Sequence, residues 1–215
     1  MDSLSKIYDG ASVALVGGVD AFDARILDVD VVVRVNGHWQ KQRGKCDVLY
    51  WSSASDLPWN IFDDEELWWT LRHVAFSFSP ALFSEASITH INAARRKCEA
   101  HGVSWSRYFH APAEAWQVFS RLQDAPTSEC FCKELSERYS FHPLTGAIAL
   151  HHILMHSPRS VYVTNMNLYA KNGALPEEVG RHKTEPNRAF FLDASRDERV
   201  TYSEEFEDSL RLAIR

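Results

Sequence analysis

Short apolar runs bounded by glycine or polar residues recur along the chain and predict β-strands. The first, Ser12 to Gly18 (SVALVGG), predicts a buried strand that ends in a tight glycine turn. Asp30 to Asn36 (DVVVRVN) and Cys46 to Trp51 (CDVLYW) predict a second and a third strand, because β-branched and aromatic side chains favour extended backbone. Much later in the chain, Ser160 to Asn165 (SVYVTN) has the same character and predicts a further strand.

Segments with helical spacing or helix-end signals lie between and after these runs. They predict helices that begin near Asp63 and that cover Ser84 to His101, Pro112 to Leu122, Glu129 to Tyr139, Thr145 to His156 and Ser203 to Ile214. Residues 61–140 are therefore expected to be a helical middle, and residues 170–190, rich in glycine and proline, a lid-like loop. The alternation predicts an α/β protein: a single Rossmann-like domain over residues 1–215, with a mostly parallel sheet flanked by helices.

Composition and charge exclude several classes of protein. The chain has 215 residues, of which 45% are hydrophobic, so disorder is not expected. Its net charge of -6 argues against binding nucleic acid through general phosphate neutralisation. No window approaches the ~20 apolar residues needed to cross a bilayer, and the start lacks the pattern of a signal peptide. With only four cysteines, the chain is expected to be a cytoplasmic protein without a membrane span.

Glycine and asparagine stand directly after the first two predicted strands, at the end of a strand where α/β proteins bind ligands. Gly17 and Gly18 follow the first strand, and glycine there would let a nucleotide approach the backbone closely. Asn36 follows the second strand, and its amide can bond a ribose or base with both ends. From the residues alone, a plain glycine turn and an Asn-Gly turn are the competing interpretations.

Two later segments add polar candidates. Thr145 and Gly146 open a predicted helix, and the free N–H groups and dipole of a helix start suit an anion, although a simple capped helix also explains them. Asn165, Asn167 and Tyr169 gather polar groups at the end of the late strand. These five residues extend the same predicted ligand edge.

His182 is the histidine that we nominate as a general base. It lies in a polar loop, and a neutral imidazole suits proton removal near pH 7. No metal is expected. Cys130 and Cys132 lack a second pair of ligands at zinc spacing, and the Asp-x-Asp pattern of residues 28–30 marks the start of a strand.

Taken in order, these segments resemble the sialyltransferases, both the bacterial lipooligosaccharide type and the animal glycan type. Ser12 to Gly18 resembles the opening strand and glycine turn of the family, and Asp30 to Asn36 resembles its D-x-V-x-R-x-N stretch. His142 to Gly146 (HPLTG) is similar to the second motif, where Pro and Thr-Gly open a helix at the donor. Val161 to Tyr169 resembles the following strand, which ends in G-x-D-x-Y.

The resemblance covers roughly residues 12–60 and 141–212 and leaves the middle unmatched. It implies a glycosyltransferase whose donor substrate is a CMP-activated, sialic-acid-like sugar, transferred to an acceptor hydroxyl without a metal cofactor. It also implies that His182 is the general base. The residues that it implies for binding the nucleotide and phosphate are Gly17, Gly18, Asn36, Thr145, Gly146, Asn165, Asn167 and Tyr169.

Other functions stay open at this point. The chain has Gly18, Asn165 and Asn167 where the family usually has Asn, Gly and Asp, which favours a non-catalytic, nucleotide-binding relative. A glycosyltransferase that acts on a modified nucleic-acid base or a small metabolite is a further alternative. The basic groove for such an acceptor would be formed by Arg34, Lys41, Arg43 and Lys45. The sequence also leaves a homo-oligomer open.

Overall fold

The computed structural model describes residues 4–19, 21–36, 39, 43–52, 59–78, 85–109, 144–166, 168 and 184–212. These residues form the strands β1 (Ser12–Val16), β2 (Val31–Val35), β3 (Val48–Ser52), β4 (His73–Phe78), β5 (Ser104–Phe109), β6 (Ser160–Thr164) and β7 (Val200–Tyr202). The α-helices are α1 (Ser5–Tyr8), α2 (Glu65–Trp68), α3 (Glu85–Ala100), α6 (Thr145–Met155), α8 (Thr184–Ala194) and α9 (Glu204–Leu212). Two short 3₁₀ helices are η1 (Ala24–Asp28) and η3 (Trp59–Asp63).

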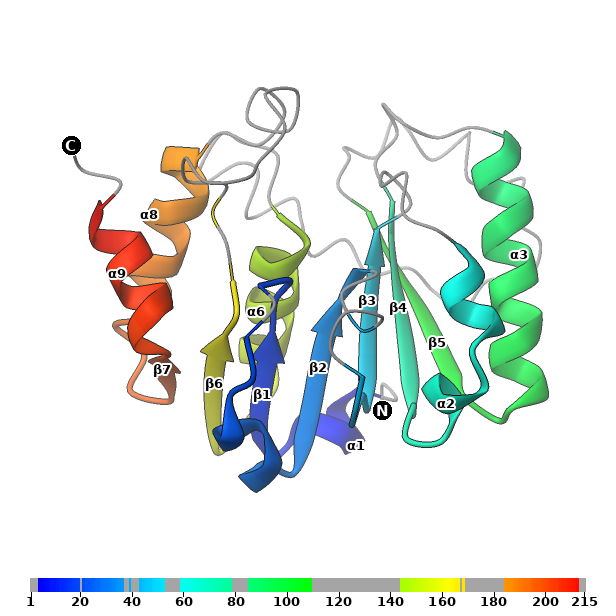
Figure 1. Cartoon of the computed structure of the whole chain (residues 1–215), viewed down its shortest axis with the longest axis horizontal. Coiled ribbons are helices and arrows are strands. Elements are labelled where there is room, and N and C mark those ends of the chain that lie inside the picture. Colours follow the sequence, from blue (N-terminus) through cyan, green and yellow to red (C-terminus); the bar gives the residue numbers. More distant parts are fainter. Residues whose placement is uncertain are drawn as a thin grey trace.

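The seven described strands form one parallel sheet in the order β5-β4-β3-β2-β1-β6-β7. From β1 the chain adds β2 to β5 on one side, then returns to place β6 on the other side of β1 and β7 beyond it (Figure 1). Val13 of β1 thus pairs with Val31 on one side and with Val161 on the other. The strand order reverses between β1 and β6, and doubly wound sheets bind ligands outside the carboxyl ends of the strands at such a point.

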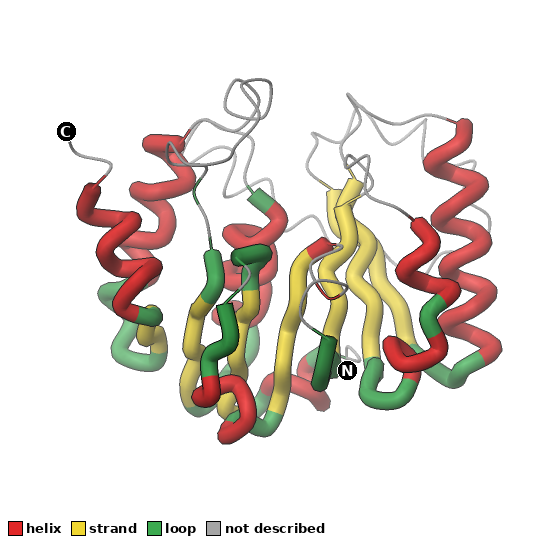
Figure 2. The backbone as a smooth tube through the Cα atoms, in the orientation of Figure 1, coloured by secondary structure: helices red, strands yellow, loops and turns green. Residues whose placement is uncertain are grey.

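Helices cover both faces of the sheet. The helices α1, α6, α8 and α9 pack on one face, in a core that contains Leu15, Ile153 and Phe191. On the opposite face, α2, α3 and η3 pack against β3 and β4 in a second core that contains Leu49 and Phe76. The outer face of β1 is covered by the connection to β2, which is a loop that ends in η1 (Figure 2). This face of β1 is therefore covered by a single 3₁₀ helix and its loop in the described part of the fold.

The expected fold class is confirmed: the protein is an α/β protein of Rossmann-like architecture with a parallel sheet between helices. The expected strands at the start of the chain and at Ser160 correspond to β1, β2, β3 and β6. The expected helices at Ser84, Thr145 and Ser203 correspond to α3, α6 and α9. The positive φ of Gly102, +68°, explains why α3 stops just before it. Among the described residues, no helix is long and apolar enough to span a membrane.

The expectation of a helical middle is wrong for β4 and β5. Both strands contain polar residues that no apolar pattern would mark. His73 is fully buried, and its two ring nitrogens lie 2.8 and 2.7 Å from the hydroxyls of Ser104 and Ser106 on the neighbouring strand. These hydrogen bonds satisfy the polar side chains inside the sheet. The sequence of either strand alone therefore looks too polar to be buried. The expected helices at Pro112 to Leu122 and Glu129 to Tyr139 lie outside the described residues.

Two further boundaries need correction. The predicted lid over residues 170–190 is wrong in its last part, because α8 begins at Thr184. Pro186 lies in the first turn of α8, where a missing N–H is tolerated, so this proline marks the start of a helix instead of a loop. The helix expected near Asp63 is the single turn α2, and the Asp64 side chain caps it by accepting a bond from the Glu66 N–H at 3.1 Å.

Candidate functional site

The carboxyl ends of β1, β2 and β6 and the start of α6 bring together five predicted site residues. Gly17 follows β1, Asn36 follows β2, Asn165 follows β6, and Thr145 and Gly146 begin α6. Hydrogen bonds and close contacts link these residues across more than a hundred positions of sequence. The sequence-based expectation that they share one edge of the sheet is therefore met in the geometry.

Asn36 connects three elements at this edge. Its Nδ2 donates to the Thr145 hydroxyl at 3.3 Å, and its Oδ1 accepts from the Ser52 N–H at 2.9 Å. The backbone of Asn36 has a φ of 53°, a left-handed conformation that asparagine tolerates better than most residues. Both ends of the amide thus hold the ends of β2, β3 and α6 together, and one N–H of Nδ2 remains to meet a ligand.

The start of α6 supplies further hydrogen-bond donors. Leu144 is the N-cap residue, and its side chain offers no oxygen to cap the first turn. The first bond of the helix runs from the Ile148 N–H to the Leu144 carbonyl at 3.1 Å, so the N–H groups of Thr145, Gly146 and Ala147 have no acceptor inside the helix. Together with the Thr145 hydroxyl and the helix dipole, these groups favour a negatively charged ligand.

Helix α8 fixes the position of this helix start. The fully buried side chain of Asn187 on α8 accepts a hydrogen bond from the Leu144 N–H at 2.9 Å. Asn187 is a residue that sequence reasoning missed. Its partner is 43 positions away, and the only local sign is an asparagine in an otherwise ordinary helix start. It satisfies the backbone N–H of the N-cap residue from outside the helix and so ties the start of α6 to α8.

Steric contacts explain two of the three glycines of the predicted site, Gly17 and Gly146. A Cβ on Gly17 would stand 2.7 Å from the carbonyl carbon of Asn165 and from the Cα of Met166, so only glycine allows β1 and β6 to end this close together. A Cβ on Gly146 would stand 2.9 Å from the side chain of Met166. Gly18, which is half-buried, follows Gly17 directly.

Asn165 closes the turn between β6 and the segment after β1. It has a φ of 55° and is 9% exposed. Its Nδ2 donates to the Ala21 carbonyl at 2.6 Å, and its own carbonyl accepts from the Val19 N–H at 2.9 Å. The Asn165 amide is therefore engaged by the protein, and its main effect is to hold residues 19–21 against β6.

Below this turn, an acidic side chain is tied to β6. The Asp23 carboxylate accepts hydrogen bonds from the hydroxyls of Tyr162 and Thr164 and, at 3.0 Å, from the Arg25 N–H. Burial raises the pKa of Asp23, but these hydrogen bonds outweigh burial and hold the pKa below its ordinary value. Burial and the neighbouring Asp23 raise the pKa of Tyr162 to about 12. Tyr162 is thus a neutral donor to Asp23, which explains its place inside the strand.

The remaining predicted residues are not placed. His182, Asn167 and Tyr169 lie outside the described residues. In the part of the chain that is described, no three His, Cys, Asp or Glu side chains gather in an arrangement that could hold a metal ion. Cys46 and Cys98 are buried free thiols, and burial raises the pKa of each to about 12.

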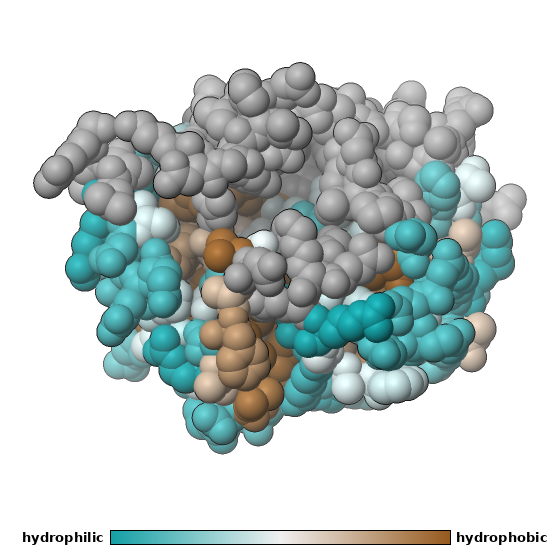
Figure 3. Space-filling view, viewed as in Figure 1, coloured by the Kyte–Doolittle hydropathy of each residue, from teal (hydrophilic) through white to brown (hydrophobic). Residues whose placement is uncertain are grey.

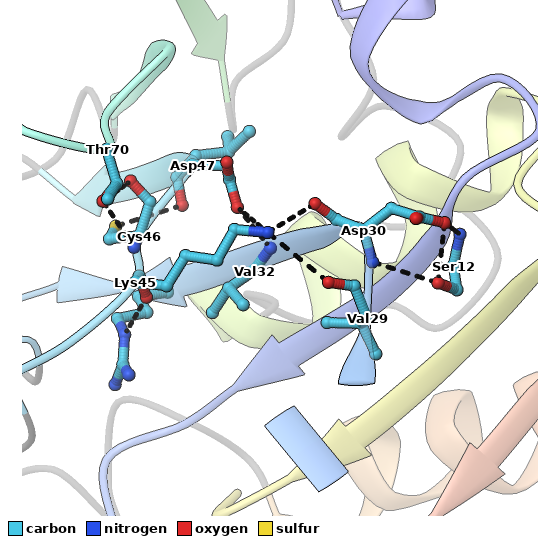
Figure 4. Close-up of polar contacts among 10 residues, drawn as sticks. Ser12, Val29, Asp30, Val32, Lys45, Cys46, Asp47 and Thr70 are labelled. Atoms are coloured by element: carbon cyan, nitrogen blue, oxygen red, sulfur yellow. Dashed lines mark hydrogen bonds and ion pairs between the residues drawn. The ribbon is translucent and has the colours of Figure 1, made fainter. Parts of the chain in front are cut away.

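The basic residues considered for a nucleic-acid groove are occupied or buried where the structure describes them. Arg34 is 4% exposed, and its Nε donates to the Lys45 carbonyl at 3.0 Å. The Lys45 ammonium bonds the Asp30 carbonyl at 2.6 Å and lies 3.4 Å from the Asp47 carboxylate (Figure 4). Arg43 pairs with the carboxylates of Asp64, at 2.9 Å, and Glu66, at 2.7 Å, at the start of α2. The described members of this set therefore form no open basic groove.

The fold and the donor-rich edge define the class: an α/β protein with a Rossmann-like parallel sheet whose candidate ligand site lies at the point where the strand order reverses. No protein-family model and no curated protein matches the chain. A solved structure that resembles it is the sialyltransferase CstII from Campylobacter jejuni in complex with a substrate analogue, CMP-3FNeuAc. The two share 12% identity over 89% of this chain and 80% of that chain, with a TM-score of 0.49. A similarity of this size does not transfer a function.

Proposed function

We propose that this protein is a glycosyltransferase that takes its sugar from a CMP-activated, sialic-acid-like donor. The observation that carries the proposal is the bond between Asn36 and Thr145, which joins the ends of two strands to an uncapped helix start at the switch point of the sheet. This edge of the sheet offers hydrogen-bond donors to a ligand: the Thr145 hydroxyl, one N–H of Asn36 and the first N–H groups of α6. A monophosphate suits these groups, because neutral donors stabilise its charge when they are already in place.

The proposed reaction transfers the sugar to an acceptor hydroxyl in one displacement. The acceptor oxygen attacks the anomeric carbon, the bond from that carbon to the phosphate oxygen breaks, and CMP leaves with both electrons of that bond. We assign the acceptor proton to His182 and the contacts to the departing phosphate to Thr145, Gly146 and Tyr169. Gly18, Asn36 and Asn167 would line the nucleotide. Gly17 and Asn165 would support the site through the turn that they build.

Thermal unfolding with CMP, CDP, UMP, UDP, GDP and NAD tests the donor. A ligand at 100 times its dissociation constant stabilises a protein by about 2.7 kcal/mol, which shifts the midpoint visibly. The proposal expects a selective shift with CMP. A shift with diphosphate nucleotides alone would indicate a nucleoside-diphosphate sugar as the donor instead of a CMP-sugar. An absence of any shift would contradict the proposed nucleotide site.

The His182→Ala variant tests the general base. We expect turnover of a CMP-sugar to fall by at least ~100-fold with CMP affinity unchanged, because general base catalysis contributes on that scale. His101→Ala is the matched control, since His101 is an exposed histidine just after α3. Near-normal transfer by His182→Ala would remove the residue from the mechanism.

A second candidate is a nucleotide-binding relative that does not catalyse transfer. The observation that favours it is the locked amide of Asn165, which stands where the family resemblance calls for glycine. In this case CMP would bind, but neither hydrolysis nor transfer of a CMP-sugar would be detected over a range of acceptors. Detection of either reaction decides against this candidate.

A further inference from the structure

The connection between β1 and β2 exposes apolar side chains on the outer face of the sheet. Phe22 is 80% exposed, Leu27 is 71% exposed, and Val19 is 39% exposed. The neighbouring Ile26 is buried against Ala14, Val16 and Val32, so η1 uses one apolar side chain for the core and turns the next one outward. Figure 3 shows apolar surface in the lower centre of this face, beside hydrophilic surface. We call the exposed side chains of Val19, Phe22 and Leu27 the η1 patch.

Isolated exposed apolar residues are ordinary, but here three of them fall within nine positions of one short connection. Parallel sheets are normally covered on both faces. In the described part of the chain, η1 and its loop are what cover the outer face of β1. The geometry therefore favours a partner that completes this layer.

The charges beside the patch identify the partner. Arg25 and Asp28 both lie on η1, three positions apart, so in a 3₁₀ helix they project from the same side. The Arg25 side chain is 59% exposed, and its guanidinium lies 4.3 Å from the Tyr162 ring while only its Nε approaches Asp23, at 3.5 Å. Asp28 is exposed and has no hydrogen-bond or ion-pair partner in the described structure. A half-exposed positive charge, which Asp23 contacts only at its Nε, and the unpartnered negative charge of Asp28 thus flank the apolar centre.

We infer that the η1 patch is the interface between two copies of this chain, related by a two-fold axis. In a two-fold interface the same surface meets itself, so Arg25 of one copy faces Asp28 of the other, and this contact occurs twice. A nucleic acid or a lipid surface would need a basic rim, whereas the rim here carries both signs. The apolar centre is then buried between the copies and the charges set the register.

The first test is the oligomeric state by sedimentation velocity of the full chain, at concentrations up to roughly 100 µM, where a micromolar dimer is well populated. We expect a dimer that dissociates on dilution. The variant Phe22→Glu/Leu27→Glu should sediment as a monomer. Trp69→Glu is the matched control, because Trp69 is 77% exposed but belongs to the turn after α2, and it should remain dimeric. A monomer in the wild-type protein at every concentration would overturn the inference.

Charge reversal tests the orientation independently. Arg25→Asp and Asp28→Arg should each weaken dimerisation by at least ~tenfold, because like charges then face each other. The double variant Arg25→Asp/Asp28→Arg should restore it, since the two residues exchange roles across the axis. All three variants change exposed side chains, and an unchanged circular dichroism spectrum verifies their fold. A double variant as weak as the single ones, or single variants without effect, would contradict the two-fold arrangement. Neither result depends on nucleotide binding.

Discussion

At the scale of single residues, Asn36 and Thr145 show how a side chain can serve structure and ligand together. The amide of Asn36 holds the ends of three elements, and in doing so it fixes the Thr145 hydroxyl beside the free N–H groups of α6. Because these donors are positioned before any ligand arrives, little ordering is needed on binding.

Replacing Thr145 tests this arrangement. Thr145→Val keeps the shape but removes the hydroxyl, so we expect CMP affinity to fall by at least ~tenfold, equivalent to the loss of a charge-assisted hydrogen bond. Thr145→Ser keeps the hydroxyl and should stay within about threefold of the wild type. Titration calorimetry with CMP gives both values. Equal affinity for the valine and serine variants would mean that the hydroxyl does not contact the ligand.

Gly17 and Gly146 should respond differently to replacement by alanine. Gly17→Ala forces a methyl group into the backbone of Asn165 and Met166, and we expect the free energy of unfolding to drop by about 3 kcal/mol, the upper range for overpacking. Gly146→Ala meets only the flexible end of Met166, and alanine favours a helix by about 1 kcal/mol, so the net change should be small. Urea unfolding of both variants measures the difference. A small effect at Gly17 would show that β1 and β6 can separate there.

The position of Gly17, Asn36 and Asn165 at strand ends could be predicted, because the apolar runs that precede them mark the strands. The sequence could not show how they are used. Gly17 and Asn165 looked like ligand contacts, yet they contact each other across the sheet. Asp23 and Asn187 gave no signal, since their partners are 139 and 43 positions away. Long-range pairing of this kind leaves no local pattern.

At the scale of elements, the start of α6 depends on α8. The Leu144 side chain cannot cap the helix. Its backbone N–H donates to the buried Asn187 side chain of α8, which ties the start of α6 to α8. The helix that presents the donors is therefore held by a helix that begins 39 positions after it starts, from Thr145 to Thr184.

Asn187→Ala should weaken both stability and binding. It leaves the Leu144 N–H without its acceptor, which costs about 1–3 kcal/mol in a buried place, and it frees the start of α6 to move. We expect weaker CMP binding together with a lower melting temperature. Glu185→Ala is the control on the same helix, because this side chain is 67% exposed. If Asn187→Ala lowers stability but leaves CMP affinity intact, the position of α6 does not control binding.

The strands and helices differ in how clearly their own residues predict them. The strands β1, β2, β3 and β6 stood out because most of their residues are β-branched, aliphatic or aromatic. The strands β4 and β5 did not, because the buried His73 and its two serine partners interrupt their apolar pattern. Helix α8 was hidden by Pro186, whose usual association with loops does not hold in the first turn of a helix.

At the scale of the whole molecule, a buried polar chain links the two sides of the core under α6. The Tyr50 hydroxyl lies 2.7 Å from Nδ1 of His152, and the Tyr8 hydroxyl donates to Tyr50 at 3.3 Å. Burial, followed by the charges of His156 and His73, holds the pKa of His152 well below its ordinary value. The folded protein therefore keeps His152 neutral in a range where the unfolded chain takes up a proton.

This difference predicts sensitivity to acid. Above pH ~6.5 both states are neutral at His152, and below it only the unfolded state binds the proton, so the free energy of unfolding should fall by up to ~1.4 kcal/mol per pH unit. Urea unfolding between pH 5 and pH 8, within about that window, measures the slope for the wild type and for His152→Gln. The variant should lose this part of the slope. Identical slopes would mean that His152 is protonated in the folded protein as well.

The central place of β1 also governs the order of assembly. Its partner β2 follows within twenty residues, but its other partner, β6, begins only at Ser160. A chain emerging from the ribosome thus carries β1 as an open edge, apolar on both faces, until the residues from Ser160 onward have been made. Closure of the sheet is a late, long-range event, and such events fold slowly. The same strand reversal that brings the candidate site together therefore leaves an apolar strand edge exposed until late in synthesis.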